Sequence, residues 1–335
     1  MSWKRALGIS GGALVIAGAA MFIPIRYDAA TSTPTATATP ISMDGYSADK
    51  PSKPLNVLFI HHSIGGSLLA AEGPQQGDKA DKCIWDTHPS GGGLRDKLGA
   101  QGYSVHEASY GSAVGEDTDL FHWPGKFSTQ MDAILALKLQ DERLAEGQKN
   151  HVVAFKSCFP NNMFTGQGTA PGNAAGPELT VWNAKASLNA VLRELEKHPD
   201  TLFVYLTAPP VAPKPEPMRL YRVLVRMLKG RFEPEWTARQ AEWARELNSW
   251  VVSKDGWLKD YTKNNVVVFD YYDVLTGHGA SNLSRYATGE GDDSHPSAEG
   301  NRAAAEAFVP FLNRAVRRSG LVPGATAAND QGGVP

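Results

Sequence analysis

Residues 57–67 read Val-Leu-Phe-Ile-His-His-Ser-Ile-Gly-Gly-Ser, and the prediction of the fold starts from them. The four apolar residues predict a buried strand, and the chain from Ser67 onward can form a helix. Ser63 stands where the strand gives way to the helix. There the first N–H groups and the positive end of the helix dipole favour a developing oxyanion. A serine that only caps the helix would occupy the same position, so both interpretations stay open on this stretch alone.

The composition excludes some classes of protein. The chain has 335 residues, 42% of them hydrophobic, and a formal net charge of -2. This is enough apolar sequence for a large core, and it gives no reason to expect a nucleic-acid partner. The two cysteines, Cys83 and Cys158, fit no zinc pattern and leave open one disulfide or two free thiols. No metal or other cofactor is expected.

The N-terminal sequence predicts export. Lys4 and Arg5 precede an apolar run over residues 6–25. A run of this length suits a transmembrane signal anchor over residues 1–27, or a cleaved signal peptide. The basic end stays inside, so the rest is expected outside the cytoplasm, in the cell envelope or secreted. Residues 28–54 are rich in Thr, Ala and Pro, which predicts a disordered linker. A domain over residues 55–320 follows, and then a disordered tail over residues 321–335.

Apolar strands alternate with helices through the domain. We expect buried strands at residues 57–60, 103–108, 152–155, 202–207 and 266–270, and one of the helices at residues 128–139. This alternation predicts a three-layer α/β/α sandwich around a parallel sheet of about five strands. Residues 211–235 look like an insertion, in which a helix carries a basic stripe of Arg219, Arg222, Arg226 and Lys229. Such a stripe is usually a solvated face, with contact to anionic lipid or glycan as the alternative.

Polar groups follow the strand ends, where parallel sheets place their active sites. Asp292 and His295 are three residues apart on a predicted turn, so the carboxylate can orient the imidazole as a general base for Ser63. Oxyanion donors are expected from the Ser63 amide, a glycine of residues 111–115, and Asn161 or Asn162. Each feature has a purely structural interpretation as a cap or a turn.

Four blocks of sequence resemble the SGNH/GDSL hydrolases, over roughly residues 55–318. Residues 61–66 (His-His-Ser-Ile-Gly-Gly) stand where that family carries its nucleophile, which implies Ser63. Residues 110–118 resemble the second block and imply Gly115 as an oxyanion donor. Residues 156–162 stand in the place of the third block and imply Asn161 in preference to Asn162. Residues 292–296 (Asp-Asp-Ser-His-Pro) resemble the last block and imply Asp292 as the orienting acid and His295 as the base. The resemblance also implies a flavodoxin-like sheet.

The leading hypothesis is a membrane-anchored serine hydrolase outside the cytoplasm, acting on carboxylic esters such as O-acyl groups of glycans. The alternatives are an O-acyltransferase on cell-envelope glycan and a non-catalytic glycan-binding or envelope protein of the same fold. A less favoured alternative is a metal-dependent hydrolase whose ligands come from His61, His62, Asp117, Asp119, His122, Asp292 and His295. His62 is expected to be a buried, hydrogen-bonded residue, with a proton relay as the alternative. The oligomeric state is not predicted.

Overall fold

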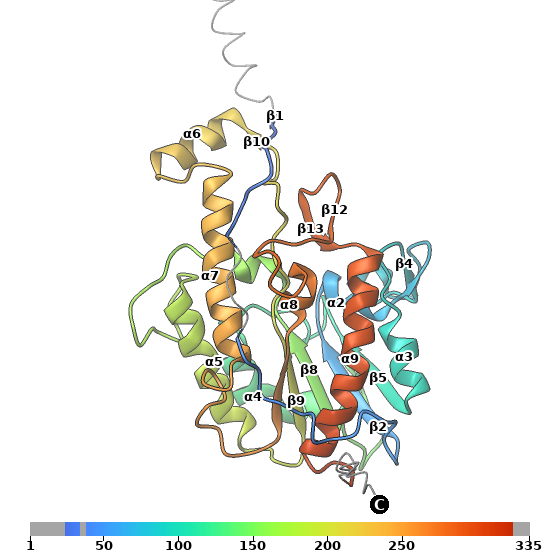
Figure 1. Cartoon of the computed structure of the whole chain (residues 1–335). Coiled ribbons are helices and arrows are strands. Elements are labelled where there is room, and N and C mark those ends of the chain that lie inside the picture. Colours follow the sequence, from blue (N-terminus) through green and yellow to red (C-terminus); the bar gives the residue numbers. More distant parts are fainter. Residues whose placement is uncertain (1–23, 34–37, 324–335) are drawn as a thin grey trace, which may run out of the picture.

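The computed structural model describes residues 24–33 and 38–323, and a seven-stranded sheet forms its centre (Figure 1). Six strands are parallel to their neighbours, and the strand at one edge is antiparallel. Their order across the sheet is β11 (Val266–Phe269), β9 (Leu202–Leu206), β8 (Val152–Lys156), β2 (Leu55–Ile60), β5 (Tyr103–Ala108), β6 (Leu137–Leu139) and β7 (Glu142–Arg143).

Helices cover both faces of this sheet (Figure 1). The two layers arise because the central strands alternate their apolar side chains: Val57 and Phe59 enter one core cluster, and Leu58 and Ile60 enter the other. One face is covered by α2 (Ser63–Leu69), α3 (Leu94–Ala100) and α9 (Ala298–Arg318). The other face is covered by α4 (Trp123–Leu135), α5 (Val181–Leu195) and α7 (Glu235–Val252).

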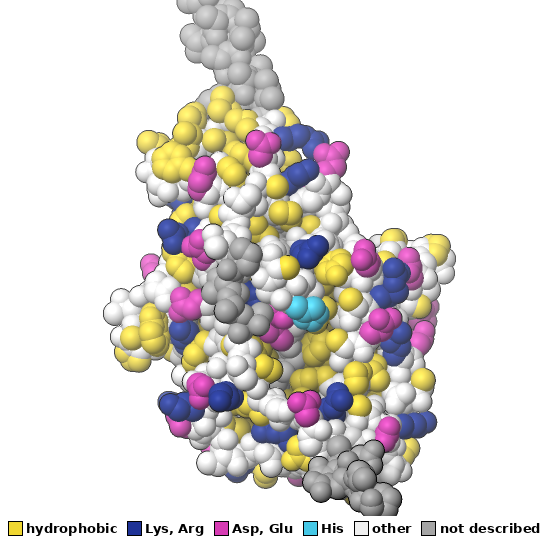
Figure 2. Space-filling model, in the orientation of Figure 1, with side chains coloured by type: hydrophobic (Ala, Val, Ile, Leu, Met, Phe, Trp, Pro, Cys, Tyr) yellow, Lys and Arg dark blue, Asp and Glu magenta, His cyan; other side chains and the backbone are white. Residues whose placement is uncertain are grey.

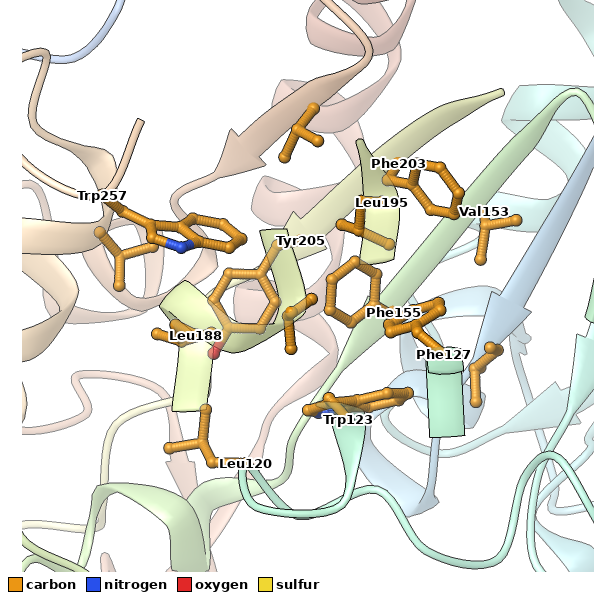
Figure 3. Close-up of a cluster of buried hydrophobic side chains, with 14 of the residues drawn as sticks. Leu120, Trp123, Phe127, Val153, Phe155, Leu188, Leu195, Phe203, Tyr205 and Trp257 are labelled. Atoms are coloured by element: carbon orange, nitrogen blue, oxygen red, sulfur yellow. The ribbon is translucent and has the colours of Figure 1, made fainter. Parts of the chain in front are cut away.

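An aromatic cluster fills the space beneath α4 and α5 (Figure 3). The rings of Phe127 and Phe155 meet edge to face at 4.9 Å, and Phe155 lies 5.3 Å from Tyr205. Aromatic pairs prefer such tilted contacts, and each large ring buries much apolar area. The cluster therefore holds β8 and β9 rigid just below the edge of the sheet where those strands end.

The remaining elements are short and lie around the two ends of the sheet. They are β1 (Pro24–Ile25), β3 (Ala71–Glu72), η1 (Ala80–Lys82), β4 (Thr87–His88), η2 (Phe159–Asn162), β10 (Met218–Arg219), α6 (Leu220–Leu228), α8 (Tyr271–Thr276), β12 (Ala287–Thr288) and β13 (Asp293–Pro296).

The prediction of about five parallel strands was wrong in strand number and orientation. The five expected apolar runs are strands, but β6 and β7 extend the sheet and β7 is antiparallel. The sequence predicts a helix over residues 128–139, whereas α4 ends at Leu135. The buried Asn150 ends it, since its side-chain amide donates to the Ile134 and Leu137 carbonyls at 3.1 and 2.8 Å. The freed residues can then pair with β5.

The predicted N-terminal transmembrane helix is also not part of the observed fold. Its residues 6–23 lie outside the described residues, and Pro24–Ile25 pair with Met218–Arg219 as strands. No helix within residues 24–33 and 38–323 has the length and apolar character to cross a membrane. The fold prediction is corrected accordingly.

The segment predicted as a disordered linker, residues 28–54, lies against the domain wherever it is described. Ala30 is buried and its N–H donates to the Pro213 carbonyl at 2.7 Å. Near the other end, the buried Arg317 donates to the Asp49 carbonyl at 2.8 Å. Polar and small residues are held here by backbone hydrogen bonds rather than by a core of their own. Of the predicted tail, residues 324–335 lie outside the described residues.

Candidate active site

Ser63 and His295 meet at the edge of the sheet where the parallel strands end. Ser63 is the first residue of α2, directly after β2, and its Oγ lies 2.9 Å from His295 Nε2. The two residues are 232 positions apart in the sequence, so the fold alone brings them together. A serine hydroxyl donating to an imidazole nitrogen is the pair that general-base activation of a nucleophile requires.

The carboxylate that orients His295 is Asp293. Its Oδ1 lies 2.6 Å from His295 Nδ1 and also accepts from the His295 backbone N–H at 2.9 Å. The Thr288 hydroxyl donates to Asp293 Oδ2 at 3.0 Å. Burial alone would raise the pKa of Asp293, but the hydrogen bonds and charge of His295 outweigh it and lower that pKa. The carboxylate therefore stays ionised and keeps the proton on Nδ1, which leaves Nε2 free to act as a base.

The assignment of the acid to Asp292 is corrected, because Asp293 occupies that position. The reason is the conformation of residues 293–296, which form strand β13 and not a turn. Side chains two residues apart share one face of a strand, so Asp293 and His295 lie together. Ser294 faces the opposite way and accepts from the Ala212 N–H at 2.9 Å. Asp292 precedes the strand and lines a neighbouring cleft.

A buried ionic network lies directly behind the nucleophile. Glu107 is 4% exposed and accepts from Arg95 Nη2 at 2.6 Å and from His61 Nε2 at 3.1 Å. Burial by itself raises the pKa of Glu107, but the hydrogen bonds and charges of His61 and Arg95 outweigh it, and the pKa is lowered. His61 is fully buried and packs against Gly65 of α2, where an added Cβ would lie 2.3 Å from the His61 Cβ. The network thus fixes the start of the helix that carries Ser63.

His62 holds the loop that follows β5. Its Nε2 faces the carbonyls of Gly115 and Glu116 at 2.9 and 2.8 Å, so this nitrogen donates. The Thr118 hydroxyl lies 3.2 Å from Nδ1. Burial lowers the pKa of His62 and favours the neutral ring that this bonding pattern needs. His62 was predicted to be a buried, hydrogen-bonded residue; it is hydrogen-bonded but only partly buried, and its contacts hold the loop in place.

The predicted oxyanion donors are not all free. The Gly115 N–H donates to Ser112 Oγ at 2.8 Å, and the Asn161 side-chain amide donates to Asp119 Oδ1 at 2.7 Å. Asn162 is fully buried and donates to the Ala208 carbonyl at 2.7 Å. The Ser63 N–H belongs to the first turn of α2, where a helix has no internal partner for it. Of the predicted set, the Ser63 amide is therefore the donor best placed to meet an oxyanion.

Tyr110 is a further residue at this site that the sequence reasoning left without a role. Its ring stacks on His62 with centroids 3.7 Å apart, and its phenol lies close enough to the Ser63 side chain to affect the pKa of the phenol. Burial and the nearby thiols of Cys158 and Cys83 raise the pKa of Tyr110 to about 12, so the phenol keeps its proton. Its place immediately after a predicted strand was the signal that could have identified it.

A cleft of about 510 Å³ opens beside His295. Phe159 lies on its wall and meets the His295 ring edge to face at 5.5 Å. The opposite wall comes from the insertion at residues 211–235, with Tyr221 and Arg222 of α6 among its side chains. A second cavity of about 520 Å³ lies at β11 and α9. None of Ser63, Asp293 and His295 lines either cavity, but the first is lined by Phe159, which contacts His295, and by Asp292 and Ser294 on both sides of Asp293 in the sequence. The first cleft is therefore the one that lies next to His295.

The alternative metal-ligand set is not assembled. Within residues 24–33 and 38–323, no three His, Cys, Asp or Glu side chains are grouped so that they could hold a metal ion. Cys83 and Cys158, for which a disulfide and free thiols were both open, are free thiols.

No protein-family model and no curated protein matches the chain. Three solved structures are similar to it in fold. A candidate acylhydrolase from Bacteroides fragilis is 12% identical, with a TM-score of 0.38 over 80% of this chain and 93% of that one. The periplasmic domain of a lipopolysaccharide acetyltransferase from Salmonella ser. Paratyphi A is 10% identical, with a TM-score of 0.36 over 78% and 85%. A carbohydrate esterase is 14% identical, with a TM-score of 0.34 over 78% and 69%.

These neighbours are of the kind that the resemblance to SGNH/GDSL hydrolases predicts. At such low TM-scores and identities they establish no activity for this chain. The chemistry has to be inferred from the side chains at the edge of its own sheet.

Proposed function

We propose that the protein is a serine hydrolase of carboxylic esters, with Ser63 as nucleophile, His295 as general base and Asp293 as orienting acid. The observation that carries this proposal is the continuous chain of hydrogen bonds from Ser63 Oγ to His295 Nε2, 2.9 Å, and from His295 Nδ1 to Asp293 Oδ1, 2.6 Å. Nothing in a helix cap requires a histidine and a carboxylate to follow the serine in this order.

The proposed reaction has two steps. Ser63 Oγ attacks the ester carbonyl while His295 Nε2 takes the hydroxyl proton, and the oxyanion forms beside the start of α2. The C–O bond to the leaving alcohol then breaks as His295 returns the proton to it, which leaves an acyl-serine. Water attacks the acyl group with the same histidine as base, and the carboxylic acid leaves with Ser63 restored.

Two donors are proposed for the oxyanion, the Ser63 N–H and the Tyr110 phenol. Tyr110 lies near Ser63 and stays protonated, so we propose that its phenol donates to an oxygen that forms next to Ser63 Oγ. The amides of Gly115 and Asn161 would first have to give up the partners described above. We therefore propose that Gly115 and Asn161 support the loops and do not bind the oxyanion.

The cleft favours a polar acylated compound. Phe159 and Tyr221 offer aromatic rings, and Lys214 and Glu216 add charged hydrogen-bonding groups to its lining. Such a mixture suits a glycan carrying an O-acyl group better than a long hydrocarbon chain. The O-acyl glycan is thus the proposed substrate class, and transfer of the acyl group to a sugar hydroxyl is the alternative outcome. Placement outside the cytoplasm stays a prediction from the N-terminal sequence.

The test compares two serines of the same helix. Ser63→Ala is expected to lower turnover of p-nitrophenyl acetate by about 10⁵-fold and to abolish labelling by a serine-reactive phosphonate. Ser67→Ala, one turn further along α2, should keep both the turnover and the labelling. Undiminished turnover in Ser63→Ala would disprove the mechanism. Products formed from an acetylated sugar, with and without an acceptor sugar, distinguish hydrolysis from transfer.

A further inference from the structure

Helix α6 and the residues that follow it carry most of the exposed large apolar side chains of the described chain. The described residues include six exposed large apolar side chains, and five of these lie between residues 224 and 232 (Figure 2). These five are Leu224, Val225, Met227, Leu228 and Phe232, with Leu228 89% exposed. Single exposed apolar residues are ordinary in soluble proteins, but such a cluster usually marks a surface that contacts another phase or molecule.

The same segment is strongly basic. Residues 218–232 contain five Lys or Arg residues and no Asp or Glu. On α6 the spacing of Arg222, Arg226 and Lys229 places them on one side, while Leu224 and Leu228 share another. Arg226 forms an ion pair with Glu233, which ties α6 to the beginning of α7. The helix is therefore amphipathic, with an apolar face and a cationic face.

The position of α6 leaves its apolar face uncovered within the described chain. None of its residues is buried, and it projects beyond the three layers of the fold (Figure 1). Strand β10, immediately before α6, pairs with β1, so the chain enters the described fold beside this helix. The residues that precede β1 in the sequence form the apolar run that begins at Ala6.

We infer that helix α6 and its flanking residues, 218–232 together, form an interfacial surface that lies on an anionic lipid bilayer. Its exposed leucines and Phe232 would enter the boundary between headgroups and acyl chains, and its basic side chains would contact anionic headgroups. A soluble polyanion would use the charges but would leave the apolar side chains in water. A protein partner would need an apolar groove bordered by acidic groups. The bilayer offers an apolar phase beneath anionic headgroups over its whole surface, and this inference does not depend on the esterase mechanism.

The test is hydrogen–deuterium exchange of the full chain with two kinds of vesicle. One kind is pure phosphatidylcholine, and the other is equal parts of phosphatidylcholine and phosphatidylglycerol. Exchange is followed on the peptide that spans α6, so vesicle binding by another part of the chain does not count as binding by α6. The amides of residues 220–228 should become protected on the anionic vesicles only, while those of α3 stay unchanged.

Three variants sharpen this test. Leu228→Asp should reduce the protection of α6 on anionic vesicles about tenfold, because a carboxylate at this exposed position does not enter the lipid as the leucine does. Lys229→Gln should reduce it about fivefold through the loss of one headgroup contact. Met163→Asp alters the one exposed large apolar residue of the described chain that lies outside residues 218–232, and should leave the protection unchanged. Thermal melts in the absence of vesicles show whether each variant is folded.

Several results would overturn the inference. Equal protection on neutral vesicles would remove the role of the charges. Protection by a soluble acidic polysaccharide without vesicles would assign the surface to a glycan. Protection that rises with protein concentration in the absence of lipid would assign it to a second copy of the chain. Unaltered exchange under all these conditions would show that α6 is only a solvated helix.

Discussion

The side chains at the catalytic edge are hydrogen-bonded to one another, whereas the apolar side chains of the α6 surface (residues 218–232) are exposed to solvent. At the catalytic edge, polar groups find partners from distant parts of the chain, as Ser63 and His295 do across 232 positions. Behind them, the buried Glu107 carboxylate forms hydrogen bonds with His61 and Arg95. On the α6 surface the apolar groups are exposed instead, and Leu228 is 89% exposed.

This difference separates two kinds of function. A site for chemistry must hold its groups in one geometry, which buried and mutually bonded residues do. A surface for docking must keep apolar groups accessible, and it gains its free energy only when the partner arrives. Substitutions at the catalytic edge should therefore change activity or stability in the isolated protein, and substitution of the exposed Leu228 on α6 should change neither without a bilayer.

The largest effect after that of Ser63 is expected at Asp293. Asp293→Asn should lower kcat for p-nitrophenyl acetate by about 10³-fold, because an amide cannot hold the proton on His295 Nδ1 as a carboxylate does. Asp292→Asn is the matched control and should change kcat by less than about threefold, since a cleft residue that leaves His295 in place does not alter the base. Steady-state kinetics of the two purified variants decide the matter. The reverse ranking would return the role of acid to Asp292.

The next effect concerns the stability of the network behind the nucleophile. Glu107→Gln should lower the free energy of unfolding by about 3 kcal/mol at neutral pH, because it leaves the partly buried Arg95 and the buried His61 without their carboxylate. The folded pKa of Glu107 lies below its ordinary value of 4.5, so the unfolded chain binds the proton more readily. The stabilisation is therefore complete above about pH 4.5 and is lost as the pH falls through the folded pKa.

Urea unfolding over a pH series measures this effect. In Glu107→Gln the loss of stability on acidification should be smaller than in the parent protein. Glu290→Gln removes the carboxylate of an ion pair with Arg26 in which both side chains are mostly exposed, and should change stability by less than about 0.5 kcal/mol. Equal effects of the two substitutions would show that the buried network is no stronger than a surface pair.

The smallest effect is expected at Tyr110. Tyr110→Phe should lower kcat about tenfold and leave the Michaelis constant nearly unchanged, since the phenol is proposed to bind the oxyanion of the transition state. Tyr221→Phe removes the hydroxyl of a cleft tyrosine on α6 and should act on the Michaelis constant and not on kcat. A loss confined to the Michaelis constant in Tyr110→Phe would assign the phenol to substrate binding. A loss of kcat in Tyr221→Phe would show that α6 takes part in catalysis.

Structural features that depend on residues close together in the chain could be predicted from the sequence. Apolar runs such as residues 57–60 and 202–206 are strands of the sheet, because a strand buried on both faces must be apolar at every position. Ser63 and His295 could be named as candidates because a serine after a strand and an Asp-x-x-His stretch before a helix are visible as short patterns. Exposure of α6 could not be read in this way, although its basic stripe could.

Features with distant causes were decided only by the tertiary structure. The end of α4 depends on the amide of Asn150, and the freed residues 137–139 form strand β6, which periodicity assigned to a helix. Asp293 and not Asp292 contacts His295 because residues 293–296 form strand β13. That strand pairs with β12, which lies outside the Asp-x-x-His motif. Short-range patterns specify which groups are present, whereas the partner of each group depends on contacts between residues that the sequence keeps far apart.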